Sequence, residues 1–269
     1  MPRFISQPSF FSWEEVLLSP DDFTFNSTTV LSRDHHSPPG NLAWPNPNAT
    51  QGQAEMTEAV QMWLPIPGTA DSNQTFAQWC WSTQVFQSMT ITAEIAWYRR
   101  GAGRSENNLG SLVWQFNDIW QGTSWSAVEY SGRWKVMQYG FVSAYAPVFV
   151  WPFWTPENET LEVVVTNDRW ESVSGQVQMT WYDWSGVELE TSWQNFTVPT
   201  LNSSLILREV GRNSILPKGK SAQGVFMLLN LTAEVDGKKV TNEQVVCSSH
   251  SLSWKYRTNN FAVYTCITG

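Results

Sequence analysis

The spacing of apolar residues predicts one long helix in the first half of the chain. From Phe76 to Tyr98 apolar residues recur at helical intervals, and the segment contains neither Gly nor Pro. It ends in Arg99 and Arg100 followed by Gly101, a basic last turn and a glycine stop. A second, shorter helix is expected at 13–18.

An apolar run of strand length follows the long helix, from Gly110 to Asp118. It closes in the polar pair Asn117 and Asp118, as a buried parallel strand does at the mouth of a sheet. Helix, buried strand and polar tip together indicate a β/α repeat. Residues 32–68, rich in His, Pro, Gly, Asn and Gln, predict a long surface excursion.

After about residue 145 the pattern changes to short strands separated by turns, with no helical periodicity between them. The predicted strands are 161–165, 175–182, 196–198, 204–207 and 224–235. Several alternate apolar and polar positions, which favours an antiparallel β-sandwich. The expected fold class is therefore α/β followed by all-β, with the boundary near 147–156.

Composition excludes several classes of protein. The chain has 269 residues and a net charge of -8, with 15% charged and 14% aromatic residues. So many aromatic residues exclude an intrinsically disordered chain, and the acidic balance without a basic stripe argues against nucleic acid as a partner. No membrane partner is expected, since the longest apolar stretch, 144–154, is interrupted by Pro147 and Pro152.

Seven Asn-x-Ser/Thr sequons predict passage through the secretory pathway. They start at Asn26, Asn48, Asn73, Asn158, Asn195, Asn202 and Asn230. The N-terminus, however, lacks the apolar region of a signal peptide and by itself indicates a cytosolic protein. We expect the conflict to be resolved by a start that is missing from the sequence.

Several ordered blocks resemble one enzyme family. The blocks are Trp114-Gln-Phe-Asn-Asp-Ile-Trp-Gln121, Tyr98-Arg-Arg100, Glu129-Tyr-Ser-Gly-Arg-Trp-Lys135, Arg33-Asp-His-His36, Trp181-Tyr-Asp-Trp-Ser-Gly186 and Val240-Thr-Asn-Glu-Gln244. They are similar to the β-mannosidases of glycoside hydrolase family 2, most of all the secreted fungal type. The resemblance runs from Met1 to about Gln244.

The resemblance implies the last two β/α units of a TIM (β/α)8 barrel followed by an immunoglobulin-like sandwich. Residues 1–145 would be the C-terminal portion of the barrel, 146–243 the Ig/CBM-like sandwich and 244–269 a divergent tail. Implied substrates are β-mannoside oligosaccharides, with release of terminal β-D-mannose from manno-oligosaccharides and N-glycans by two glutamates and no cofactor. The intact protein would be secreted or lysosomal/vacuolar, and a homodimer is one assembly left open.

The chain departs from the family where the nucleophilic glutamate belongs. The sequence there reads Arg3-Phe-Ile-Ser-Gln7-Pro-Ser-Phe10. Either Gln7 occupies the nucleophile's position, or the segment that carries the glutamate is deleted. An amide cannot form the glycosyl ester, and the acid/base residue belongs to a strand that the sequence does not contain. We predict an inactive chain, with a non-catalytic carbohydrate-binding or accessory protein as the alternative.

The end of the chain also departs from the family pattern. After Gln244 the sequence is explained either by read-through in a shifted frame or an unspliced intron, or by a genuine hairpin closed by a Cys247–Cys266 disulfide.

Trp114, Asn117 and Asp118 are the candidate substrate-binding residues, because they lie at the expected C-terminal tip of a barrel strand. Trp114 would offer an aromatic face to mannose, and Asn117 or Asp118 would bond its hydroxyls, directly or by ordering neighbouring groups. The competing interpretation is that Trp114 fills the barrel and Asp118 caps the next helix. No metal site is expected, since His35 and His36 lack further ligands at suitable spacing.

Aromatic residues of the second half have two interpretations as well. They are Trp151, Phe153, Trp154, Trp170, Trp181 and Trp184. They could form a carbohydrate-binding face, but core and interdomain packing is favoured, since a sandwich core needs alternating aromatic residues.

Overall fold

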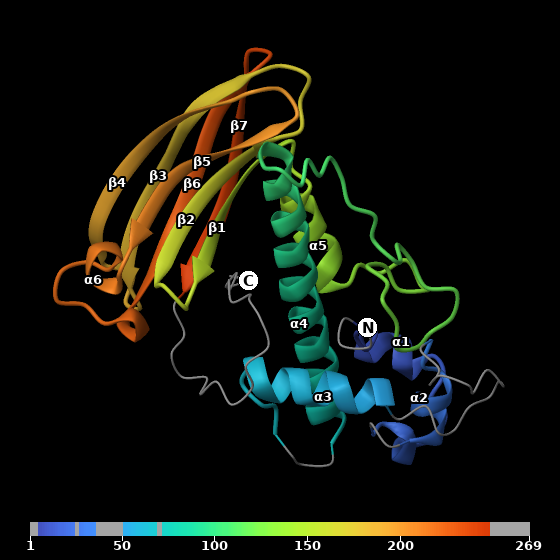
Figure 1. Ribbon diagram of the computed structural model, residues 1–269. Helices are drawn as coiled ribbons and strands as arrows, with labels where there is room; N and C mark the ends of the chain where they lie inside the picture. The colour runs from blue at the N-terminus through green and yellow to red at the C-terminus, as the bar shows by residue number, and fades with distance from the viewer. Residues whose placement is uncertain (1–4, 25–26, 36–50, 69–71, 248–269) are drawn as a thin grey trace. The chain divides into compact units, whose positions relative to one another are not determined.

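The computed structural model describes residues 5–24, 27–35, 51–68 and 72–247. The chain divides into two compact units, which are described separately (Figure 1). Residues 1–92 and 112–141 form the first, here called the helical unit. Residues 93–111 and 142–269 form the second, the sandwich unit. No helix of the described residues is long and apolar enough to cross a membrane.

Helices dominate the regular structure of the helical unit. They are α1 (Phe10–Glu14), η2 (Pro20–Asp22), α2 (Thr28–Ser32), α3 (Gln51–Trp63), α4 (Asn73–Arg100) and α5 (Val136–Ala144), of which α4 and α5 continue into residues of the sandwich unit. The predicted long helix is confirmed as α4, with its basic last turn. The predicted helix at 13–18 is partly wrong, because α1 begins earlier and ends at Glu14.

Small apolar clusters hold the helical unit together. Trp13, Val30, Phe76 and Cys80 form one of them, with the Phe76 ring 6.5 Å from Trp13 in an edge-on arrangement. Val60, Trp79 and Phe86 are the centre of another. Each cluster joins segments far apart in the sequence, so α4 is held mainly by packing.

The strand predicted in the run from Gly110 to Asp118 is wrong. Residues 112–116 belong to no strand, and Asn117 forms only an isolated parallel bridge with Val128. Leu112 is fully exposed, and Trp114 and Phe116 are also exposed. A parallel strand exists only when neighbouring strands satisfy its backbone groups, and no strand of the described residues lies beside this segment. The apolar pattern alone could not show this.

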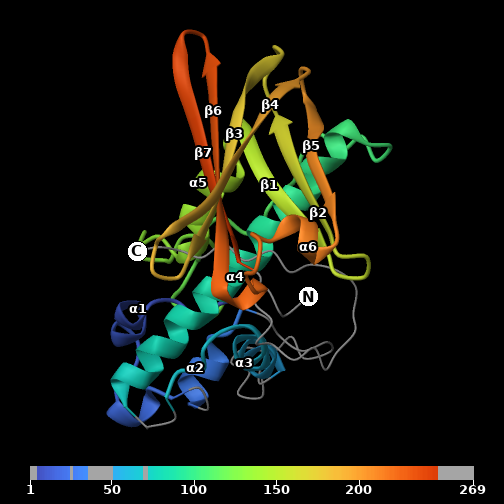
Figure 2. The same ribbon diagram turned by 90° about the vertical axis from the view of Figure 1, so that its left-hand side faces the viewer.

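The sandwich unit contains two antiparallel sheets, which confirms the predicted all-β half (Figure 2). One sheet has the order β1 (Val148–Thr155), β2 (Thr160–Asn167) and β5 (Asn202–Val210). The other has the order β4 (Glu188–Val198), β3 (Val173–Asp183), β6 (Val225–Val235) and β7 (Lys238–Cys247). The short elements are η3 (Gly101–Gly103), α6 (Arg212–Ile215) and η4 (Ala222–Gly224).

Strand β1 lies where the sequence analysis placed a boundary. It contains Pro152, which is tolerated because β1 pairs only with β2 and is an edge strand of its sheet. A two-residue turn joins β6 to β7, since Val235 pairs with Lys238. Asp236 and Gly237 both have positive φ angles, of 52° and 68°, as a two-residue hairpin turn of this type requires.

Aliphatic side chains from both sheets fill the space between them. Val150, Val163, Val177 and Leu229 are among the buried members of this cluster. Strand β6 shows the cause most clearly, since buried residues alternate along it with more exposed ones from Val225 to Val235. Burial of each such side chain contributes roughly 1.5–3 kcal/mol before entropy is counted.

Strand β1 is also buried on its other face, where Phe149, Trp151 and Phe153 pack against Ala93 and Ala96 of α4. Packing is therefore confirmed for Trp151 and Phe153. Trp154 and Trp181 are half-buried against the main core, whereas Trp170 and Trp184 are exposed.

Candidate functional site

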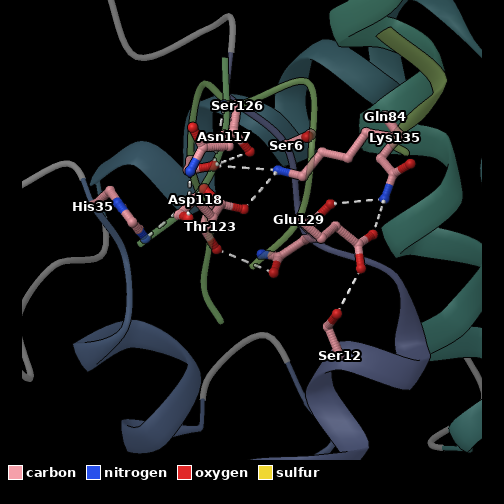
Figure 3. A network of polar contacts seen from close by, with 12 residues as sticks. Ser6, Ser12, His35, Gln84, Asn117, Asp118, Thr123, Ser126, Glu129 and Lys135 are labelled. Carbon is pink, nitrogen blue, oxygen red and sulfur yellow. Dashed lines mark hydrogen bonds and ion pairs between the residues drawn. The ribbon is translucent and has the colours of Figure 1, made fainter. Parts of the chain in front are cut away.

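A network of buried polar side chains lies inside the helical unit (Figure 3). It joins the segment before α1, the middle of α4 and the chain between Asn117 and Lys135. Its members include Ser6, Gln7, Ser12, Gln84, Asp118, Thr123, Ser124, Ser126, Glu129 and Lys135. Buried polar groups destabilise a fold unless they are paired, so each contact within this network matters.

Glu129 is the most fully paired residue of the network. Its carboxylate accepts hydrogen bonds from the backbone N–H of Ser9 at 2.7 Å, from the Ser9 hydroxyl at 2.8 Å and from the Ser12 hydroxyl at 2.5 Å. The Arg133 guanidinium lies 3.5 Å away, and the Glu129 side chain is 1% exposed. These contacts anchor the start of α1 to a loop 120 residues later.

Gln7 is buried and bonded through both its backbone and its side chain. Its N–H donates to the Thr83 hydroxyl at 3.0 Å, and its carbonyl accepts from Gln84 Nε2 at 3.1 Å. Its side-chain Oε1 accepts from the Thr123 hydroxyl at 3.1 Å. The residue at the candidate nucleophile position is thus part of the unit's interior.

Asp118 lies between two basic side chains. Lys135 Nζ is 3.7 Å from one carboxylate oxygen and His35 Nε2 is 4.0 Å from the other. The side chains of Asp118 and Lys135 are fully buried, and that of His35 is 6% exposed. Neither Asp118 oxygen accepts a hydrogen bond from a described residue. The carboxylate is held by charge rather than by directed bonds.

Burial sets the titration of the two basic groups. It lowers the pKa of the Lys135 ammonium, while Asp118 and Glu129 act in the opposite direction. It also lowers the pKa of the His35 imidazole below its ordinary 6.5, against the effect of Asp118. The His35 ring also stacks on Trp120, with 4.0 Å between centroids.

The three candidate substrate-binding residues have different environments. Trp114 is 74% exposed, and the peptide bond that follows it is cis. Asn117 is also exposed, and its amide donates to the Asp118 carbonyl at 3.0 Å. Asp118 is buried, so its carboxylate is not exposed to solvent, and its part in substrate binding stays a prediction. Asp118 does not cap a helix, because the next helix, α5, begins at Val136.

Glu129 and Lys135 carry the network, yet the sequence analysis gave them no role. Both stood within a block used for the family resemblance. Charged residues are scarce in this chain, and Lys135 follows Trp134 directly, but burial of a charge depends on distant segments that local patterns do not reveal.

The block Tyr98-Arg-Arg100 has a structural role in the sandwich unit. The Arg99 guanidinium donates to the carbonyls of Ala144 and Ala146 and lies 2.9 Å from Asp168. Arg100 stacks over the Trp97 ring, 3.4 Å from its centroid. These contacts fix the last turn of α4 within that unit.

The structure places five of the seven sequons. Asn73, Asn158 and Asn195 are exposed, whereas Asn202 and Asn230 are half-buried. Asn26 and Asn48 lie outside the described residues. So do His36 and Cys266, which leaves the proposed disulfide with Cys247 a prediction. Within the described ranges, no group of three or more His, Cys, Asp or Glu could hold a metal ion.

Known proteins share the sequence of this chain in part or over most of its length. The Mannosidase Ig/CBM-like domain family matches residues 159–249, which begin just before β2 and include β7. Beta-mannosidase A of Aspergillus oryzae is 43% identical over 235 residues, covering 85% of this chain and 25% of the relative. Beta-mannosidase A of Aspergillus niger is 38% identical over 261 residues, covering 93% and 27%.

Solved structures share the fold. A β-D-mannosidase from Dictyoglomus thermophilum superposes with a TM-score of 0.67 at 17% identity, over 89% of this chain and 26% of that one. An exo-chitosanase from Amycolatopsis orientalis gives 0.61 at 17% identity, over 91% and 26%.

The chain therefore carries an Ig-like domain of the mannosidase type. Along most of its length it is similar to the C-terminal part of the β-mannosidases of glycoside hydrolase family 2, among them fungal Beta-mannosidase A. It spans about a quarter of the length of these relatives.

Proposed function

We propose that this chain forms the C-terminal portion of a secreted β-mannosidase. Such an enzyme releases terminal β-D-mannose from manno-oligosaccharides and N-glycans with retention of configuration. Support comes from about 40% identity to Beta-mannosidase A along most of the chain, which includes both units. We propose further that the 269 residues by themselves do not hydrolyse mannosides.

The proposed domain division follows the same resemblance. Residues 1–145 correspond to the end of a (β/α)8 barrel, 146–243 to the Ig-like sandwich and 244–269 to a divergent tail. The Mannosidase Ig/CBM-like match over residues 159–249 supports the sandwich part of this division.

Gln7 is the observation that carries the proposed inactivity. A retaining glycosidase needs two carboxyl groups about 5–5.5 Å apart, one of them a nucleophile. The Gln7 amide is buried and held by Thr123, and an amide does not form the glycosyl ester. Asp118 and Glu129, two carboxylates of the network, are buried beside Lys135 and Arg133.

The test is hydrolysis of an aryl β-mannoside by the purified chain, with an intact β-mannosidase as positive control. No released phenol is expected from the chain or from its Gln7→Glu variant, because the new carboxylate would be as buried as Gln7. Release by the unaltered chain at a rate that scales with protein concentration would overturn the proposal.

A non-catalytic carbohydrate-binding role is the second candidate, and one feature of the sandwich unit favours it. Trp184 is 59% exposed, and its ring lies 5.1 Å from that of Phe226, which stacks in turn on Tyr182 at 5.5 Å. Aromatic faces of this kind suit the apolar face of a sugar ring. Calorimetric titration with mannobiose tests this role: heat that Trp184→Ala abolishes supports it, and no heat at millimolar sugar contradicts it.

A further inference from the structure

The sheet β4-β3-β6-β7 has one face in the sandwich core and one polar face, here called the outer face. Across the outer face Trp193, Gln178, Asn230 and Glu243 are successive partners in register. Asn195 lies on the same face of β4, two residues after Trp193, and pairs with Gln176. An indole and an amide thus lie side by side on one strand.

Strand β4 is an edge strand, since it pairs only with β3 within its sheet. It is long, and most of its residues are exposed or half-buried. Trp193 is 56% exposed, which is unusual for so large an apolar side chain. An open edge that carries an exposed indole favours pairing with other chains unless something covers it.

Asn195 begins the sequon Asn195-Phe-Thr197, in which Phe196 is buried in the core. Gln176 Nε2 donates to Asn195 Oδ1 at 2.8 Å. This bond fixes the carbonyl side of the amide, and the exposed side chain leaves Nδ2 in solvent. Nδ2 is the atom that carries the sugar in an N-linked glycan.

The other described sequons lack this arrangement. Asn202 is half-buried, and its Oδ1 accepts from the N–H of Ser203. Asn230 is half-buried on β6, inside the sheet. Asn73 and Asn158 are exposed, but neither follows an aromatic residue by two positions, as Asn195 follows Trp193.

We propose that Asn195 carries an N-linked oligosaccharide whose first N-acetylglucosamine packs on Trp193 and covers the open edge of β4. In the transfer, Nδ2 bonds to the anomeric carbon of an oligosaccharide donated by a polyprenyl diphosphate. The bond from that carbon to the diphosphate oxygen breaks, the lipid diphosphate leaves with the electron pair, and Nδ2 loses one proton. The inference rests on the secretory route proposed above.

The test uses the full chain secreted from yeast behind a host signal peptide. Glycopeptide mass spectrometry is expected to find Asn195 occupied. Trimming to a single N-acetylglucosamine is expected to leave the melting temperature unchanged, whereas Asn195→Gln lowers it by about 2–4 °C, the range for a modest loss in a domain of this size.

A mutant cycle separates sugar packing from other effects. In a Trp193→Thr background, where the sequon is intact, Asn195→Gln is expected to change the melting temperature by less than about 1 °C, because the packing partner is gone. Thr197→Ala removes the glycan but keeps Asn195, so it should lower the melting temperature as Asn195→Gln does. It differs only in losing the hydrogen bond between the Thr197 and Ser174 hydroxyls.

Two results would overturn the inference: an unmodified Asn195 in protein whose other sequons are occupied, or an equal shift in both backgrounds. Because the test supplies its own route of secretion, neither result bears on the proposed function. If the native route does not pass through the secretory pathway, the proposed function fails, while the acceptor geometry of Asn195 is unaffected.

Discussion

The two units of this chain differ in the kind of side chain that they bury. The sandwich unit buries mainly aliphatic side chains between two sheets, and Val150, Val177 and Leu229 need no partner beyond close contact. Among its described residues, the helical unit has small apolar clusters and buries Glu129, Asp118 and Lys135 with several hydroxyls and amides. Apolar contact tolerates small changes of shape, whereas a buried charge tolerates no loss of its partner.

The difference suits the roles that we propose. A sandwich is a self-contained support, and its core can vary as long as volume and pattern are kept. The polar network instead fixes the chain from Asn117 to Lys135, directly after Trp114, in one arrangement. A sugar-binding role of Trp114, which stays a prediction, would depend on such a fixed segment. Substitutions should therefore distinguish the units sharply.

The largest effect is expected from Lys135→Met. Methionine fills a similar volume but leaves the Asp118 carboxylate buried beside His35 without its full charge partner. Removal of one member of a buried pair destabilises a protein by about 3–5 kcal/mol. Hydrogen exchange by mass spectrometry should show faster exchange in the helical unit and little change in β6.

The control for this prediction is Lys135→Met combined with Asp118→Asn, which removes both charges. The double variant should recover part of the lost stability, because a neutral amide is less costly to bury than an unpaired carboxylate. If the double variant is less stable than the single one, charge pairing does not hold this network together.

A somewhat smaller effect is expected from Leu229→Ala in the sandwich unit. Leu229 is fully buried, and truncation of such a side chain costs about 2–5 kcal/mol, depending on how far the core relaxes. Urea unfolding followed by near-UV circular dichroism measures the loss. Leu228→Ala on the same strand, where the side chain is half-buried on the outer face, should cost no more than about 1 kcal/mol. Equal losses of stability in the two variants would contradict the assignment of Leu229, rather than Leu228, to the core face of β6.

Ser12→Ala tests one hydrogen bond of the helical unit. The Ser12 hydroxyl donates to Glu129 at 2.5 Å, and a bond to a charged acceptor contributes about 1.5–3 kcal/mol. Differential scanning calorimetry should show the loss. Ser174→Ala, which removes an exposed hydroxyl bonded to Thr197, should change stability by less than about 0.5 kcal/mol. Indistinguishable melting of the two variants would contradict the importance of the Glu129 contacts.

Local patterns predicted those features that depend on local interactions. Helix α4 follows from its apolar period, and strand β6 from the apolar run over 224–235. The strand expected between Gly110 and Asp118 is absent, because a strand needs neighbouring strands and the spacing of apolar residues does not show whether they exist. The site divides in the same way: Trp114 and Asn117 are exposed as a binding role requires, but the burial of Asp118 depends on Lys135 and His35, which lie far along the chain on either side.

The smallest effect that we predict is a pH dependence carried by His35. Burial holds its pKa below the ordinary 6.5, so the unfolded chain binds a proton that the folded chain does not. The stability that depends on neutral His35 is fully present above about pH 6.5 and is lost as the pH falls from there through the folded-state pKa. Over that range the free energy of unfolding falls by at most about 1.4 kcal/mol per pH unit.

Asp118, Lys135 and Arg33 all act on this imidazole, and Trp120 covers one of its faces. Unfolding by urea between pH 5 and 8 should therefore show a decline below about pH 6.5 that His35→Gln removes. The remaining histidines titrate in both proteins, so the difference between the two curves reports His35 alone. A difference that does not vary with pH would mean that the imidazole takes up its proton as readily in the folded unit as in the unfolded chain.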